Sequence, residues 1–221
     1  MKEKFDTDPV TFRASSPHAT SGAYGSRSSD RPPTLIVRYD DDPRPSPPEG
    51  FEVLRPTDDA SVLMESRLRN FGTMDDALKV DGDSGVYNSL IRFDLTSIER
   101  DTVNRAVLRL YAVDGSPSGG TFVSTTVTEW DHYSVTWNSA PAADGNVLAT
   151  LGAVVPYRWY EVDVTNYARG GKPISIRITP SHGNRCAYAS SREAYGRGPE
   201  LWIKHDPFLD MSTRKLVSGN G

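Results

Sequence analysis

Apolar and polar side chains alternate with a period of two along much of the chain. In the segment 89–95, SLIRFDL, the apolar residues Ile91, Phe93 and Leu95 share one side, and Arg92 lies on the other. This period is typical of a β-strand that buries one face. We expect further strands at residues 60–64, 77–80, 107–113, 122–127, 147–151, 159–164, 174–178 and 201–203.

The expected strands are short and evenly spaced, and no segment has the period of a long helix. Residues 165–169 are expected to make at most one short helical turn. Alternation that leaves one polar face is typical of antiparallel sheets with one side in water. The pattern therefore predicts an all-β fold, an antiparallel β-sandwich of the jelly-roll type.

The segment 129–141, EWDHYSVTWNSAP, carries two tryptophans, Trp130 and Trp137. The short polar residues between them favour turns, so we expect a strand, a tight turn and a second strand at residues 134–138. Large aromatic side chains belong to cores more often than to ligand platforms. We therefore interpret both indoles as anchors for a corner of the core.

Residues 10–40 resemble residues 174–206 when small gaps are allowed. The matches fall on special residues as well as apolar ones, and a repeat of this length corresponds to a whole domain. The matched pairs include Arg13 and Arg177, His18 and His182, Tyr24 and Tyr188, Arg27 and Arg192, Pro33 and Pro199, and Leu35 and Leu201.

The repeat predicts the organisation of the chain. We expect residues 1–42 to be the C-terminal strand pair of an upstream copy, followed by an acidic, proline-rich linker at 43–50 that is stiff and extended. Residues 51–206 would form a complete β-sandwich, and 207–221 a tail or the start of the next linker. This arrangement indicates a tandem array.

The charge of the chain is nearly balanced, with a formal net charge of −4 at pH 7. Nucleic-acid binding is not expected, because it requires a clear basic excess. No apolar run reaches the roughly 18 residues of a membrane span. The single cysteine, Cys186, cannot form a disulfide within the chain or a thiolate metal cluster. Nothing places a nucleophile beside a base, so we expect no enzymatic activity.

Several motifs occur in a fixed order within residues 51–206. They are Asp59-Ala60-Ser61-Val62, Asn70-Phe71-Gly72, Ile91-Arg92-Phe93-Asp94-Leu95, Ala106-Val107-Leu108-Arg109-Leu110-Tyr111, Ser134-Val135-Thr136-Trp137-Asn138 and Pro199-Glu200-Leu201. With these motifs the chain resembles the DNRLRE domain, which is related to the alginate-type carbohydrate-binding modules and to disaggregatase-related repeats. The resemblance implies a non-catalytic β-sandwich module, extracellular or at the cell surface, often in tandem and attached to polysaccharide-degrading enzymes.

An acidic polysaccharide would be held by arginines and aromatic rings, because the planar guanidinium meets a sugar carboxylate in two hydrogen bonds. The alternative interpretation is that Arg92 pairs with Asp94 or Glu161 and only covers the sheet. The outward faces of the expected strands supply six candidate contacts: Arg92, Arg109, Tyr111, Arg177, Trp202 and Lys204.

Three residues are expected on the loop before the last strand: Tyr188, Arg192 and Glu193. The first two have counterparts in residues 10–40, which favours a structural role common to both copies. We expect an Arg192–Glu193 ion pair to pin this loop.

The positions of several aspartates make a structural calcium ion a possible cofactor. Asp81 and Asp83 alternate with glycines as in calcium loops, but the distant bidentate glutamate is missing, so a plain hairpin turn is favoured. Asp59 is a second candidate, which rests on the family resemblance alone.

These observations favour a non-catalytic extracellular carbohydrate-binding module for an acidic polysaccharide. The alternative is a structural subunit of a filament or surface layer, in which residues 10–14 and 34–39 add as strands to a neighbouring copy. A third interpretation is an accessory domain of a polysaccharide lyase. The expected partners are thus a polysaccharide and neighbouring copies of the same domain.

Overall fold

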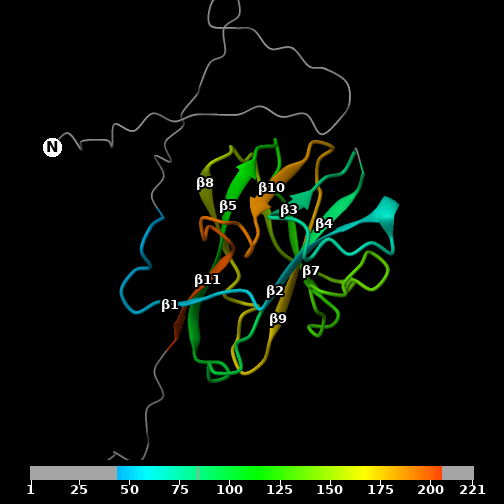
Figure 1. The fold of residues 1–221 in the computed structure, drawn as a ribbon. Coiled ribbons are helices and arrows are strands. Elements are labelled where there is room, and N and C mark those ends of the chain that lie inside the picture. The colour runs from blue at the N-terminus through cyan, green and yellow to red at the C-terminus, as the bar shows by residue number, and fades with distance from the viewer. Residues whose placement is uncertain (1–43, 84, 206–221) are drawn as a thin grey trace, which may run out of the picture. The chain divides into compact units, whose positions relative to one another are not determined.

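The structure, a computed structural model, describes residues 44–83 and 85–205. The expected strand pair in residues 1–42 and the tail 207–221 lie outside these residues. The described part of the chain is built from two antiparallel sheets with one short 3₁₀ turn, Met64–Ser66 (Figure 1). No helix among the described residues has the length and apolarity to cross a membrane.

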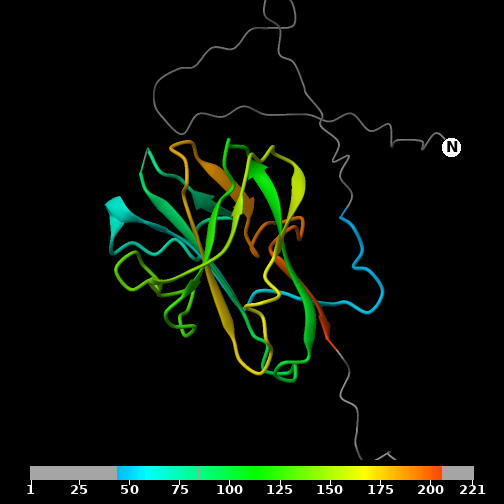
Figure 2. The ribbon, with the colours of Figure 1, turned by 180° about the vertical axis from the view of Figure 1, so that it is seen from behind.

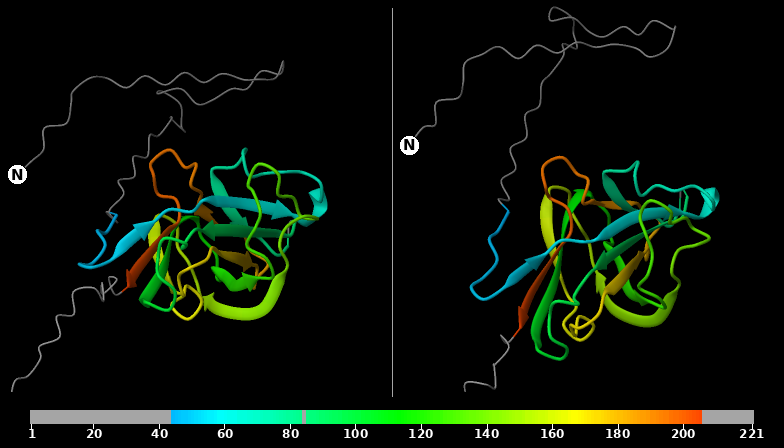
Figure 3. Two further views of the ribbon diagram at one scale, coloured as in Figure 1. Left: turned by 90° about the horizontal axis from the view of Figure 1, so that it is seen from below. Right: turned by 60° about the horizontal axis from the view of Figure 1, so that its bottom comes forward.

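Sheet A is organised around the long strand β5. One edge of β5 pairs with β8, and the opposite edge pairs first with β11 and then with β10. β1 extends the sheet beyond β11, and β3 extends it beyond β10 (Figures 1 and 3). The strands of sheet A are β1 (Glu52–Leu54), β3 (Ala77–Val80), β5 (Val103–Asp114), β8 (Arg158–Asp163), β10 (Cys186–Ala189) and β11 (Glu200–His205).

Sheet B has the strand order β2-β4-β9-β6-β7. Its strands are β2 (Asp58–Leu63), β4 (Tyr87–Phe93), β6 (Gly120–Thr125), β7 (Ala143–Leu151) and β9 (Ile174–Thr179). The chain crosses between the two sheets repeatedly, so β2 to β6 alternate between sheets B and A (Figure 2). The predicted antiparallel sandwich of jelly-roll type is confirmed.

The main core lies between the sheets and follows the predicted alternation. Ile91, Phe93 and Leu95 are fully buried, as are Leu108 and Leu110 of β5. Removing this apolar surface from water supplies the main driving force for folding, at about 25 cal/mol per Å². The inward faces that the sequence predicts for β4 and β5 are therefore the ones that fold inward.

A second, smaller apolar cluster lies on the outer face of sheet B. Leu90 contributes to it from β4, and Trp130 and Trp137 pack against it from the corner 129–141. The interpretation of both indoles as core anchors is confirmed. Residues 134–138 form turns and no strand, because the backbone N–H groups of Ser134 and Val135 bond back to the Asp131 carbonyl.

Two strands escape prediction from the alternation pattern. β1 has only three residues, and the four residues of β10 are all buried, so neither strand alternates between apolar and polar positions. Tyr188 therefore lies in β10 and not in the following loop, and it is fully buried. In β9 the alternation of isoleucines predicts an outward and exposed Ser175, but this residue is buried under the corner, and its hydroxyl accepts a hydrogen bond from Trp130 Nε1 at 2.9 Å.

Candidate functional site

The six predicted carbohydrate contacts lie on two different sheets. Arg92 and Arg177 project from β4 and β9 of sheet B, which are paired neighbours. The other four belong to β5 and β11 of sheet A: Arg109, Tyr111, Trp202 and Lys204. The structure therefore does not bring the six together in one groove.

The expectation of an exposed groove on sheet A is wrong for three residues, because Arg109, Tyr111 and Trp202 are 1%, 1% and 5% exposed. The Arg109 guanidinium lies 3.9 Å from the centroid of Trp202 and 4.7 Å from that of Trp159. Cation–π contacts of this kind are strongest where water is excluded. Arg109 is therefore a structural group, while Lys204 stays exposed at the end of β11.

Glu200 is the buried carboxylate at the centre of this arrangement. Its side chain is 2% exposed, and its Oε2 accepts hydrogen bonds from Arg109 at 3.3 Å and from Trp202 Nε1 at 2.7 Å. Its Oε1 pairs with Arg55 at 3.0 Å and with Arg44. A buried carboxylate with this many donors is held in place, and it holds Arg44 and Arg55 against the outer face of sheet A.

A hollow of about 330 Å³ opens beside these two arginines. Arg44 and Arg55 remain 38% and 51% exposed, so guanidinium N–H groups not used by Glu200 face solvent. A Cβ on Gly196 would lie 3.9 Å from Arg44 Nη1, which places the loop 190–199 across from this arginine. The hollow is lined by Arg44, Arg55, Pro56, Ser191, Gly196, Gly198 and Pro199.

Tyr195, on the same loop, is 76% exposed. The Arg197 guanidinium lies 4.8 Å from the Tyr195 ring centroid and 4.7 Å from that of Tyr111, whose hydroxyl it also contacts at 2.8 Å. Glu193 Oε2 accepts the backbone N–H groups of Tyr195 and Arg197, each at 3.0 Å. Tyr195 is thus an exposed aromatic ring on a hydrogen-bonded turn.

We call Arg44, Arg55, Tyr195 and Arg197, with the hollow beside them, the arginine edge. It places guanidinium groups and an exposed ring over the outer face of sheet A. Sequence reasoning missed all four residues because they lie outside the expected strands. The available signal was a tyrosine before a glycine and an arginine between two glycines in the segment 194–198, AYGRG.

The loop 190–199 is pinned by Arg192, but the expected Arg192–Glu193 pair is wrong. Arg192 Nη1 lies 2.8 Å from Asp59 Oδ1, and Nη2 donates to the Asp59 carbonyl at 3.0 Å. Asp59 also accepts hydrogen bonds from the backbone N–H and hydroxyl of Ser191. Arg192 pairs with the buried Asp59 of β2, because the Glu193 carboxylate accepts a backbone hydrogen bond within its own turn.

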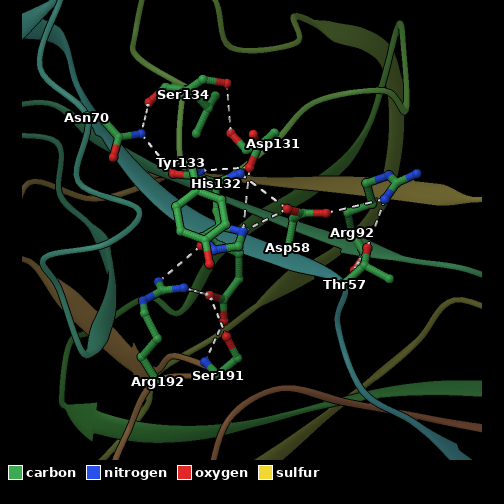
Figure 4. A network of polar contacts seen from close by, with 12 residues as sticks. Thr57, Asp58, Asn70, Arg92, Asp131, His132, Tyr133, Ser134, Ser191 and Arg192 are labelled. Atoms are coloured by element: carbon green, nitrogen blue, oxygen red, sulfur yellow. Dashed lines mark hydrogen bonds and ion pairs between the residues drawn. The ribbon is translucent and has the colours of Figure 1, made fainter.

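A polar network joins β2, the corner and this loop (Figure 4). Asp58 Oδ1 contacts His132 Nδ1 at 2.8 Å, and its Oδ2 pairs with Arg92 at 3.2 Å. Burial alone would raise the pKa of Asp58, but hydrogen bonds from the His132 ring and backbone bring it below its usual value. Asn70 donates to the carbonyls of His132 and Val135, which fixes the corner.

Arg92 covers the sheet, with partners different from those expected. It pairs with Asp58 and, at 3.4 Å, with Glu129, and its Nε donates to the Thr128 carbonyl. Arg177 donates to the Pro141 carbonyl at 2.9 Å and lies 5.4 Å from the Trp137 ring centroid. Both arginines therefore hold the corner against sheet B.

The calcium prediction fits poorly at Asp59, since Arg192 already neutralises this carboxylate. Asp81 is buried and its Oδ1 accepts the Asp83 backbone N–H at 3.0 Å, which is the bond of a tight turn. Asp81 also bridges to Tyr87, as in the hairpin that the sequence favours. Asp58, Asp131 and His132 have ligand atoms within 4.8 Å of one another, but Asp58 faces Arg92.

The comparisons with known proteins give one finding. A model of carbohydrate-binding module family 96 matches residues 51–205, which contain both sheets. No curated protein matches the chain.

Proposed function

Because the chain belongs to carbohydrate-binding module family 96, we propose that it binds an acidic polysaccharide without catalysis, at the arginine edge. The exposed Tyr195 ring would stack on a sugar face, and the guanidinium groups of Arg44 and Arg55 would pair with its carboxylates. The observation that carries this proposal is a hollow lined by two half-exposed arginines and by Gly196, the chain neighbour of the exposed Tyr195.

The site has a local rather than a bulk preference for anions. The chain as a whole has a net charge of −4, so long-range attraction to a polyanion is not expected. Binding would depend on short-range guanidinium–carboxylate pairs at the exposed surface. Such pairs weaken as salt is added, because the Debye length falls from about 10 Å at 0.1 M to about 3 Å at 1 M.

Calorimetric titration of the full chain with alginate and pectate tests this proposal. We expect Tyr195→Ala to weaken binding at least about tenfold, which is about 1.4 kcal/mol. Tyr133→Ala is the matched control, because Tyr133 is 71% exposed but is not among the residues that line the hollow. Equal losses in both variants, or no binding of either polyuronate, would overturn the proposal.

We further propose that the module works outside the cell, as one unit of a tandem array, and the sequence repeat and the family resemblance support this. The filament alternative rests on residues 10–14 and 34–39, which lie outside the described residues, and it stays a prediction.

A further inference from the structure

A second hollow, with a volume of about 820 Å³, lies beside the strand β5. Its walls come from the start of β5, the middle of β7 and the end of β8, and it shares no residue with the arginine edge. We call it the amide groove. Its lining residues are Asn104, Arg105, Asn146, Val147, Leu148, Asp163, Val164, Thr165, Asn166 and Tyr167.

The chemistry of the amide groove differs from that of the arginine edge. Three asparagines from three separate segments line it, Asn104, Asn146 and Asn166, and all three are exposed. A carboxamide both donates and accepts hydrogen bonds, as does a sugar hydroxyl. The charges of Arg105 and Asp163 offset each other, so the groove has no net attraction for an anion.

The groove walls are held in place by hydrogen bonds of the protein itself. Asp163 Oδ1 accepts the backbone N–H of Thr165 at 2.9 Å, and Thr165 Oγ1 accepts that of Ala106 at 3.0 Å. The Asn146 backbone N–H is bonded to Asp144 Oδ1 at 2.8 Å. Hydrogen bonds from Thr165 also lower the pKa of Asp163, so this carboxylate is ionised at neutral pH.

One wall of the groove is apolar. Val147 is 58% exposed, although it is β-branched and lies in a strand, and Leu148 and Tyr167 beside it are partly buried. The C–H face of a sugar ring can pack on such a wall while its hydroxyls reach the amides. Mostly preformed hollows of about 300–1,000 Å³ with a few convergent polar groups are typical of small-ligand sites.

We propose that the amide groove is a second carbohydrate site, which takes an uncharged oligosaccharide through its hydroxyl groups. Asn146, Asn166 and Asp163 bind the hydroxyls, and Val147 supports the ring. This inference uses only the carbohydrate-binding nature of the family and does not depend on the arginine edge. Two sites of different chemistry on one module allow it to bridge a charged and an uncharged glycan, with the gain that linked binding events provide.

The test is an amide-resolved NMR titration of the full chain with xylotetraose, mannotetraose and cellotetraose, each up to about 10 mM, because single-site glycan contacts can be as weak as millimolar. We expect at least one of these sugars to shift the amides of residues 146–148 and 163–167. Asn166→Ala should weaken that binding about tenfold or more. Asn138→Ala, at an exposed asparagine outside the groove, should leave it unchanged.

The outcomes separate the two sites. The absence of shifts at residues 146–148 and 163–167 with all three tetraoses would overturn the amide groove, as would wild-type affinity in Asn166→Ala. Loss of tetraose binding in Tyr195→Ala would also overturn it, because one shared site would then account for both ligands. If Tyr195→Ala loses alginate binding but keeps tetraose binding, the two sites are separate. If the wild type binds a tetraose at the amide groove but does not bind alginate, the amide groove is supported and only the arginine edge is overturned.

Discussion

At the scale of single residues, buried charge is the feature that distinguishes this sandwich. Arg109 and Glu200 lie directly opposite each other on β5 and β11, and both are 1% exposed. Removing charges from water is costly unless each one is paired and hydrogen-bonded. Here the cost is offset by Trp159 and Trp202 on the two sides of Arg109, and by further guanidinium groups around Glu200.

Replacement of Glu200 is expected to destabilise the protein strongly. Glu200→Gln keeps the shape of the side chain but leaves Arg109 buried without its inner carboxylate, which should lower the free energy of unfolding by about 3–5 kcal/mol. Urea denaturation measures this change. Glu161 is the outer partner of Arg109, and the Glu161 side chain is 54% exposed. Glu161→Gln should therefore lower the free energy of unfolding by less than about 1 kcal/mol. Similar costs in both variants would contradict the role of Glu200.

At the scale of elements, the loops are positioned by close backbone contacts and hydrogen bonds to the sheets. The corner 129–141 approaches the β2–β3 connection so closely that Gly72 leaves no room for a side chain. A Cβ there would lie 2.0 Å from the His132 carbonyl oxygen. Asn70 bonds the same carbonyl, so two neighbouring residues fix the corner.

Gly72→Ala should therefore displace the corner and destabilise the domain by about 1–3 kcal/mol, the usual cost of inserting atoms into a packed site. Thermal unfolding followed by tryptophan fluorescence measures the effect, because Trp130 and Trp137 report on the corner. Gly152→Ala is the matched control, since a Cβ there meets nothing within 4 Å. An unchanged melting temperature in Gly72→Ala would show that the corner can move freely.

At the scale of the whole molecule, polar cross-links tie the layers together. The network of Figure 4 connects β2 of sheet B with the corner and, through Asp59 and Arg192, with the loop that precedes β11 of sheet A. Asp58 is a central carboxylate of this network. Its folded-state pKa lies below the ordinary value of 3.8.

Because the pKa of Asp58 is lower in the folded protein than in the unfolded chain, the free energy of unfolding depends on pH. The contribution of Asp58 is fully present above about pH 4 and is lost as the pH falls through its folded pKa, because the unfolded chain takes up the proton first. In Asp58→Asn the free energy of unfolding should fall less steeply between about pH 4 and pH 2 than in the wild type. Urea midpoints across this range measure the slope. Asp76→Asn, at an exposed aspartate outside the network, should keep the wild-type slope.

The alternation of apolar residues was sufficient to determine the sandwich and the inward faces of its longer strands. Side chains two positions apart in a strand point to the same face. Ile91 and Phe93 of β4 therefore share one face, and Leu108 and Leu110 of β5 share another. The same pattern placed Arg109, Tyr111 and Trp202 on the opposite face, and that side of the strand is correct.

Whether that outer face meets water was decided only by the tertiary structure. Arg44, Arg55 and the loop 190–199 cover it through contacts between residues up to 156 positions apart, which leave no periodic trace in the sequence. For the same reason the partners of Arg92 and Arg192 differ from the nearby acidic residues that the sequence suggests. Periodicity thus determined which residues face the core, whereas long-range packing determined which outward residues are buried, paired or left at the surface to bind.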